Sequence, residues 1–123
     1  AGAQGDAGRG SGWKGKRMTE FVVVVTTVDD RAVADRIAEA VIGRGLAACA
    51  RISSAESVYR WNGELQRTAE FVLEIKTRAA SAAAVEAAIV ELHSYELPEV
   101  VVTPILGGSS SYLAWMRQET TPR

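Results

Sequence analysis

One histidine and the carboxylates that follow it are the residues best suited to bind a metal ion. His93 and Glu96 are close enough in sequence to share a site, and Glu99 is nearby. Imidazole and carboxylate together suit Zn²⁺, Cu²⁺ or Ni²⁺ at modest affinity. Alternatively, His93 ends a helix, where its ring bonds a backbone carbonyl and its charged form interacts with the helix dipole.

The single cysteine and the serines offer less chemistry. Cys49 lies in a run of alanines on a predicted interior strand, where cysteine behaves as a small apolar residue; the alternative is a ligand or a reactive thiol. A serine nucleophile needs a base, but the chain has one histidine and no GxSxG motif. Gly107 and Gly108 lack the spacing and the lysine of a phosphate-binding loop. We therefore expect no enzymatic activity.

Charge separates an N-terminal segment from one globular domain. The 123 residues include 14 basic and 15 acidic side chains, for a formal net charge of −1. Residues 1–17 have a net charge of +3 and six of the 11 glycines. We interpret them as a flexible N-terminal extension or an engineered remnant, and residues 18–123 as a single domain. That domain has a net charge of −4, which argues against a nucleic-acid partner.

Two features bear on the compartment. The apolar run at residues 21–25 has five residues, whereas a membrane-spanning helix needs about 20. A single cysteine allows no disulfide within the chain, which favours a reducing compartment. We therefore expect a cytoplasmic protein without a membrane span.

The apolar pattern after residue 20 predicts a strand and then a helix. Residues 21–27 are β-branched and continuous, as in a short strand buried on both faces. Asp29 or Asp30 can cap the helix that follows, and Gly45 can end it. The apolar positions of this helix are Val33, Ile37 and Val41.

The middle of the chain predicts a long hairpin. Residues 46–52 are mostly small or apolar and suit a second strand. Asn62-Gly63 is the strongest turn signal, because a type I′ turn needs two residues that tolerate positive φ. Residues 70–77 then alternate as a strand does. Its apolar face carries Phe71, Leu73 and Ile75.

The last third predicts a helix, a strand and a short terminal helix. Ser81 can cap an alanine-rich helix that runs to Leu92. Residues 100–103 suit a strand that ends at Pro104, and the serines 109–111 can cap the last helix. The large apolar side chains of the two helices are Val85, Ile89 and Leu92, then Tyr112, Trp115 and Met116.

This order of elements predicts an α+β protein with a ferredoxin-like split βαβ fold and a four-stranded antiparallel sheet. Both long helices then cover one face, and the other face is bare although residues 21–25 are apolar at successive positions. Other subunits would cover this face and the edges of the long hairpin, so we expect an obligate oligomer. The alternative is that the terminal helix folds back over that face.

Six segments in series resemble one known family. They are VVVVTTVDD, GLAACA, SVYRWNGELQ, EFVLEIKT, HSYELPEV and YLAW. In this order and spacing they are similar to the CutA family of divalent-cation tolerance proteins, over nearly all of residues 21–119. The resemblance implies a ferredoxin-like homotrimer, similar in build to the PII signalling trimers, in which the hairpins extend across neighbouring subunits.

The same resemblance implies tolerance to copper and other divalent metals. In family members that bind copper, the ligands are a cysteine late in the first strand and two adjacent histidines. Matched residue by residue, the cysteine falls on Thr26 and the first histidine on Leu92, so only His93 supplies a matching ligand. We therefore expect weak binding of a divalent metal, Cu or Zn, at His93 and Glu96, and folding that does not require it.

Aromatic residues of the matched motifs allow two interpretations. They pack the hairpin and the subunit interface, or they line clefts between subunits where a small ligand stacks. Lys76 is a surface group or pairs with Glu74 or Glu96, or else it binds an anion. The expected intersubunit cleft comprises Tyr59, Trp61, Lys76, Tyr95, Glu96 and Trp115.

Three functions remain open from the sequence. The first is a metal-responsive protein that binds divalent cations weakly. The second is a trimeric small-ligand or signalling module analogous to PII. The third is a structural trimer that affects metal tolerance through a partner.

Overall fold

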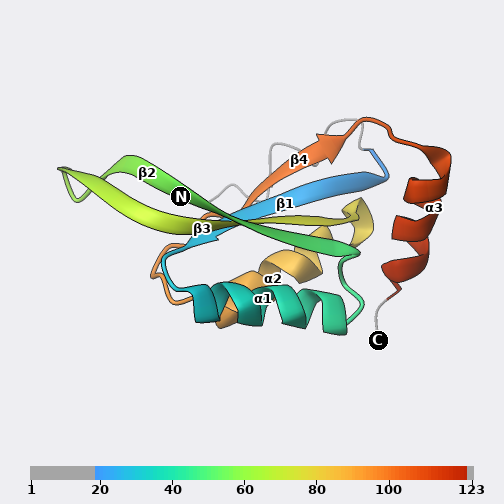
Figure 1. Ribbon diagram of the computed structural model, residues 1–123, viewed down its shortest axis with the longest axis horizontal. Helices are drawn as coiled ribbons and strands as arrows, with labels where there is room; N and C mark the ends of the chain where they lie inside the picture. Colours follow the sequence, from blue (N-terminus) through green and yellow to red (C-terminus); the bar gives the residue numbers. More distant parts are fainter. Residues whose placement is uncertain (1–18, 122–123) are drawn as a thin grey trace.

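The computed structural model describes residues 19–121, so the predicted extension at residues 1–17 lies outside the described residues. The described part of the chain folds into a sheet, two long helices and a terminal helix (Figure 1). The elements are β1 (Phe21–Val28), α1 (Arg31–Gly43), β2 (Cys49–Trp61), β3 (Glu64–Arg78), a 3₁₀ turn (Ala79–Ser81), α2 (Ala82–Leu92), β4 (Val101–Ile105) and α3 (Ser110–Glu119).

The four strands form one antiparallel sheet in the order β2-β3-β1-β4. This order and the element sequence confirm the α+β split βαβ prediction. The turn at the tip of the β2–β3 hairpin is also confirmed, because Asn62 and Gly63 both adopt positive φ, at 52° and 78°. The strand pairing fixes which side chains of β1 and β3 face the helices.

α1 and α2 pack side by side on one face of the sheet, and the core lies between the two layers (Figure 1). The predicted caps of α1 are confirmed: Asp30 accepts a hydrogen bond from the Ala32 amide at 2.8 Å, and Gly45 follows the helix with φ of 72°. The predicted apolar stripe of α1 is fully buried against the sheet. Its members are Val33, Ile37 and Val41.

Three local predictions need correction. β2 begins at Cys49 rather than residue 46, because the amides of Leu46 and Ala47 donate to the Val41 carbonyl and close α1 instead of entering the sheet. β4 continues through Pro104, which an edge strand accommodates because one of its sides has no ladder to complete. Within the described chain β2 is also an edge strand, so half-buried Cys49 does not lie on an interior strand.

Ser81 occupies the position before α2 but does not cap it through its side chain. A 3₁₀ turn precedes the helix and places Ser81 at φ −100° and ψ −3°. A capping serine normally has extended backbone angles, which aim its oxygen at the amides of the first turn. The turn therefore removes the geometry that the sequence suggested.

We call the sheet face away from α1 and α2 the open face. On β1 it carries Val23 and Val25, which are half-buried, while the side chains facing the helices are buried. The strand is thus fully buried on one side only, unlike the prediction. Val101, which pairs with Val25, is 46% exposed on the same face. The described chain therefore leaves an apolar strip of the open face uncovered.

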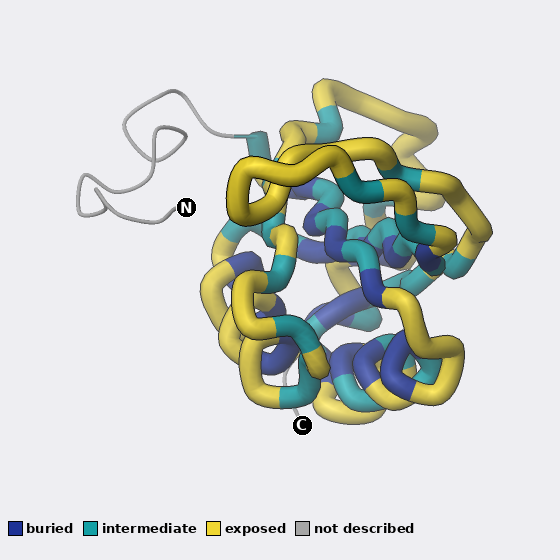
Figure 2. The backbone as a smooth tube through the Cα atoms, turned by 90° about the vertical axis from the view of Figure 1, so that its left-hand side faces the viewer, coloured by how far each residue is buried: buried dark blue, intermediate teal, exposed yellow. Residues whose placement is uncertain are grey.

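The β2–β3 hairpin projects well past the rest of the sheet (Figure 1). β1 ends opposite Phe71, so the ribbon beyond this residue has only two strands. Most of its residues are exposed, as Figure 2 shows for the hairpin that extends toward the viewer. A two-stranded ribbon is marginally stable alone in water.

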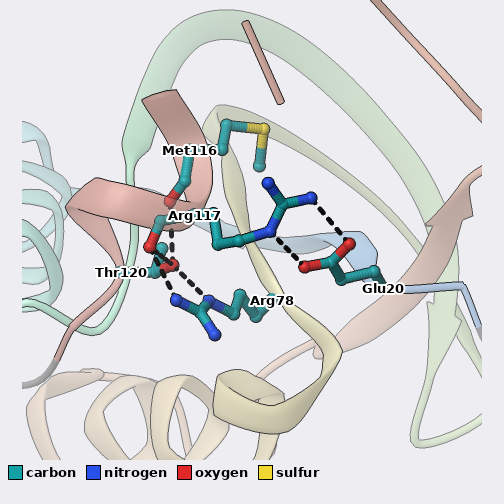
Figure 3. Close-up of polar contacts among 5 residues, drawn as sticks. All are labelled: Glu20, Arg78, Met116, Arg117 and Thr120. Carbon is teal, nitrogen blue, oxygen red and sulfur yellow. Dashed lines mark hydrogen bonds and ion pairs between the residues drawn. The ribbon is translucent and has the colours of Figure 1, made fainter. Parts of the chain in front are cut away.

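α3 lies at one end of the sheet (Figure 1) and contacts the open face there through side chains of Phe21 and Lys76. Arg78 at the end of β3 donates to Thr120 Oγ1 at 2.9 Å and to the Arg117 carbonyl at 2.7 Å. Arg117 in turn donates to both carboxylate oxygens of Glu20, at 2.6 and 2.9 Å (Figure 3). Its guanidinium also lies over the Phe21 ring. The terminal helix therefore folds back as the alternative proposed, but it covers one end of the face and not the valines in its middle.

Candidate ligand cleft

A cleft of about 660 Å³ lies at the other end of the open face, where the hairpin meets the loop after α2. β1 and the hairpin strands form one side of the cleft, and residues 94–99 form the opposite side. Its volume is within the range of about 300–1,000 Å³ typical of small-molecule sites. The residues that line it are Thr27, Ser57, Val58, Tyr59, Trp61, Glu70, Ser94, Tyr95, Glu96, Leu97 and Glu99.

A buried carboxylate organises this cleft. Glu70 is only 6% exposed, and its two oxygens accept separate hydrogen bonds. The Ser57 hydroxyl donates to one oxygen at 2.6 Å, and the Tyr95 hydroxyl donates to the other at 2.7 Å. A buried carboxylate is costly unless such bonds replace its lost hydration. The network thus ties the loop after α2 to the hairpin.

The environment of Tyr95 keeps its hydroxyl protonated. Burial raises the pKa of Tyr95 well above its ordinary value, and the hydrogen bond to the Glu70 carboxylate raises this pKa further. Ionisation of Tyr95 would place a second negative charge beside Glu70. The phenol therefore acts as a hydrogen-bond donor that positions its ring in the cleft.

His93 is held by the backbone through both ring nitrogens. Its Nε2 donates to the Thr27 carbonyl at 2.7 Å, and its Nδ1 accepts from the Tyr95 amide at 3.0 Å. The residue also ends α2, and its ring lies 4.8 Å from that of Tyr95. In this conformation neither nitrogen has a lone pair to offer a metal, so metal binding at His93 requires one of these bonds to break. The prediction that it is a ligand remains untested.

Two carboxylates besides Glu70 line the cleft, and both are exposed. Glu99 accepts a long hydrogen bond of 3.3 Å from the Thr27 hydroxyl. Glu96 lies on the same wall. Within residues 19–121 no three His, Cys, Asp or Glu side chains are grouped so that they could hold a metal ion. A metal site of His93 and Glu96 would need further ligands from water or from another subunit.

The structure brings only part of the expected intersubunit cleft together. Tyr59, Trp61, Tyr95 and Glu96 all line the described cleft. Tyr59 is also fixed by a 2.9 Å hydrogen bond between its hydroxyl and that of Thr68.

Two members of the expected set lie at the opposite end of the open face. Lys76 contacts α3, where its ammonium lies 3.3 Å from the Tyr112 hydroxyl and over the Tyr112 ring. Among the described residues it forms no ion pair with Glu74 or Glu96, and the aromatic Tyr112 takes the place of the expected carboxylate. Trp115 packs against the same tyrosine, with ring centroids 5.4 Å apart.

The positions matched to the other copper ligands face the core. Thr26 is fully buried on the helix side of β1, and its hydroxyl has no hydrogen-bond partner within the described chain. Leu92 packs against the core. These two positions therefore supply an orphaned hydroxyl and an apolar side chain.

Sequence reasoning missed Glu70 and Ser57, the two residues at the base of the cleft. The only available signal was the position of Glu70 in its strand. In the strand expected after the hairpin tip, alternation places Glu70 on the face opposite Leu73 and Ile75. Pairing of Ser57 with Thr68 across the hairpin then places its hydroxyl beside that carboxylate. Alternation alone would have placed Glu70 in solvent, so its burial depends on the loop that covers it.

The sequence and fold match one class of protein. Residues 22–119 match the family described as CutA1 divalent ion tolerance protein. The Divalent-cation tolerance protein CutA of Thermus thermophilus is 38% identical over 99 residues, which cover 80% of this chain and 96% of that protein. The chain belongs to the CutA1 family.

Solved structures and plant relatives agree with this assignment. The CutA1 structure from Shewanella sp. SIB1 superposes with a TM-score of 0.81 at 34% identity, covering 85% of this chain and 98% of that one. The rice Protein CutA 1, chloroplastic, is 40% identical over 100 residues, covering 80% of this chain. The chain spans only 56% of that rice protein and 55% of its Arabidopsis thaliana counterpart.

No helix within residues 19–121 is both long and apolar enough to cross a membrane.

Proposed function

We propose that this protein is a homotrimer that acts in tolerance to divalent metal ions, copper included, and takes up such ions weakly. The observation that carries the proposal is the cleft with two exposed carboxylates, Glu96 and Glu99, in a chain of the divalent ion tolerance family. Carboxylates are suitable ligands for divalent cations. Because the described chain holds no three-ligand group, completion of a site requires a neighbouring subunit or water.

The trimer is supported by the uncovered parts of the chain. Val101 and the half-buried Val23 and Val25 form an apolar strip, and the two-stranded end of the hairpin has no third strand to stabilise it. Burial of such a strip against another copy is worth roughly 25 cal/mol per Å² of apolar surface. Neighbouring subunits would bury the apolar strip and also pack against the two-stranded end of the hairpin.

The trimer is tested with two exposed valines. Val101→Lys places a charge on the open face, whereas Val90→Lys places one on the outer side of α2, where valine is 55% exposed. We expect Val101→Lys to shift the mass measured by light scattering from a trimer toward a monomer, and Val90→Lys to leave it unchanged. A trimeric mass for both variants, or a folded monomer for the unmodified protein, would contradict the proposal.

Metal binding is tested by calorimetric titration of the metal-free protein with Cu²⁺ and Zn²⁺. We expect weak binding that His93→Ala and Glu96→Gln reduce, while Glu86→Gln on the outer face of α2 leaves it intact. Binding that neither His93→Ala nor Glu96→Gln changes would mean that the metal binds elsewhere. Absence of binding to the trimer would favour the structural trimer that acts through a partner.

A second candidate, a PII-like small-ligand or signalling module, is favoured by the aromatic walls of the cleft. Tyr59, Trp61 and Tyr95 present ring surfaces on which a ligand can stack.

We also infer that the protein catalyses no reaction. The one histidine of the chain has both nitrogens on backbone atoms, and the Ser57 hydroxyl donates to a carboxylate.

We propose a reducing compartment, the cytoplasm, for this protein. Its one cysteine, Cys49, is a half-buried thiol without a disulfide partner. The plant relatives are named chloroplastic and the Archaeoglobus fulgidus protein is named periplasmic, so a reducing compartment is proposed for this chain on its own cysteine alone.

A further inference from the structure

The cleft combines carboxylates with aromatic rings and has no basic side chain in its lining. Among the described residues that line it are three glutamates and three large aromatic residues, and none is lysine or arginine. We propose that the cleft binds a small organic cation, an ammonium or guanidinium compound. This inference rests on the proposal that the cleft is a ligand site, and it names the class of ligand.

Three hydroxyl groups of the cleft donate their protons to carboxylates. Ser57 and Tyr95 both donate to Glu70, and the Thr27 hydroxyl donates to Glu99. These groups therefore offer a ligand only their lone pairs. A phosphate or carboxylate ligand would meet acceptors and negative charge, whereas a ligand with N–H donors and positive charge would complement both.

The aromatic rings favour a cation that sheds its water easily. A cation over the face of tryptophan or tyrosine is attracted by the ring quadrupole, and tryptophan binds best. Within the described chain Trp61 is 41% exposed and Tyr59 is 40% exposed, and both line the cleft. The bond from Tyr95 to Glu70 fixes the third ring.

The same geometry limits a bare metal ion to weak binding, in agreement with the proposed function. Both nitrogens of His93 are bonded, and both oxygens of Glu70 already accept hydroxyl protons. Only Glu96 and Glu99 remain as charged ligands, whereas transition metals need about four protein or water ligands in fixed geometry. An organic cation needs no inner ligand shell, and a cleft of about 660 Å³ can enclose it.

The test is a calorimetric titration of the full chain with four probes, with amide shifts of Tyr95 and Glu96 followed by NMR. The cationic probes are choline, a quaternary ammonium, and agmatine, an alkyl guanidinium; the anionic probes are ATP and citrate. We expect a cationic probe to bind and to shift the cleft amides. Glu96→Gln and Trp61→Leu should each weaken that binding about fivefold.

Glu86→Gln is the matched control, since it removes the same charge from an exposed position on α2 outside the cleft. It should leave the affinity for the cationic probe unchanged, and light scattering should show the same assembly for every variant. Choline or agmatine binding that survives both cleft substitutions would overturn the inference.

Two other outcomes separate this inference from the proposed function. If ATP or citrate binds at the cleft amides and neither cation does, the organic-cation inference is wrong while the ligand-cleft function stands. If none of the four probes binds at roughly millimolar concentration, the organic-cation inference and the small-ligand candidate are both wrong. The homotrimer and metal titrations remain independent of either result.

Discussion

The two ends of the open face hold polar clusters of opposite kinds. At the α3 end, the guanidinium of Arg117 pairs with the Glu20 carboxylate, and both side chains are nearly half exposed. At the cleft end, Glu70 is buried and has only the neutral hydroxyls of Ser57 and Tyr95 as partners.

This difference indicates at which end the charges are neutralised within one chain. At the α3 end, positive and negative charge cancel within one chain, and the Phe21 ring is covered. At the cleft end, negative charge has hydrogen-bond donors but no counter-charge among the described lining residues. The chain therefore closes one end of its open face and leaves the other to a ligand or a neighbour.

Loss of the buried carboxylate should have the largest effect. Glu70→Ala leaves the Ser57 and Tyr95 hydroxyls without their acceptor and should lower the free energy of unfolding by about 3 kcal/mol. Chemical denaturation at fixed protein concentration measures it. Glu70→Gln, which keeps the size and one acceptor oxygen, should lose less. Equal free energies of unfolding for Glu70→Ala and the unmodified protein would show that the hydrogen bonds to Glu70 do not stabilise the fold.

The anchor of α3 should give a smaller and more local effect. Arg78→Met removes the bonds to Thr120 and to the Arg117 carbonyl, and should favour opening of α3 by about 1–2 kcal/mol. Hydrogen exchange should then rise in α3 and stay constant in α1. Uniform acceleration across both helices would mean that α3 does not detach as a separate unit.

Two buried threonines on the helix side of the sheet allow a comparison of opposite sign. Thr26→Val removes a buried hydroxyl that has no partner in the described chain and should stabilise the protein by about 1 kcal/mol. Thr77→Val removes a hydroxyl that donates to the Leu46 carbonyl at 2.6 Å and should destabilise it by about the same amount. Thermal unfolding of both variants under the same conditions measures the difference. A loss of stability in both would imply that Thr26 has a partner after all.

Acid should weaken the anchor of α3, and we expect this effect to be the smallest. The Arg117 guanidinium hydrogen-bonds to Glu20 and lowers the pKa of that carboxyl below its ordinary 4.5. The ion pair therefore contributes fully above pH 4.5, and its contribution is lost as the pH falls through the lowered pKa of the folded state.

NMR shifts of the α3 amides, titrated from pH 6 to about pH 2, should report this loss, and Glu20→Gln should abolish the transition. The same residue change should leave the Tyr95 amide unaffected. Unchanged acid behaviour in Glu20→Gln would assign the transition to another carboxyl.

Alkaline titration tests the cleft end of the open face, through the ionisation of Tyr95. Burial and the bond to Glu70 raise the pKa of Tyr95, so its phenol stays neutral in the folded protein. Its contribution to stability is complete below the ordinary pKa of 10.0 and declines as the pH rises above it, because only the unfolded chain ionises there. Tyr95→Phe should flatten that part of the stability profile.

Local patterns predicted most of the fold. The Asn62-Gly63 turn, the Asp30 cap and the stripe of Val33, Ile37 and Val41 depend on neighbouring residues, and each is confirmed. Predictions failed at the ends of elements, where a turn took up the backbone. Ser81 loses its capping geometry to a 3₁₀ turn, and the amides of Leu46 and Ala47 close α1 before β2 can begin.

The candidate site was predictable only in its aromatic wall. Tyr59, Trp61, Tyr95 and Glu96 were expected together and do line one cleft, whereas Lys76 and Trp115 lie with α3 within this chain. His93 was expected either as a ligand or as a helix end bonded to a carbonyl, and the structure shows the bond to the carbonyl.

The order of elements, the turn and the helix stripes were determined by the sequence itself, because each reflects spacings of a few residues that set backbone angles and burial. The tertiary structure alone decided that Glu70 is buried and that His93 has both nitrogens engaged. Tyr95 reaches Glu70 across 25 residues and His93 reaches Thr27 across 66. Contacts over such separations depend on strand register and loop path, which no local pattern encodes.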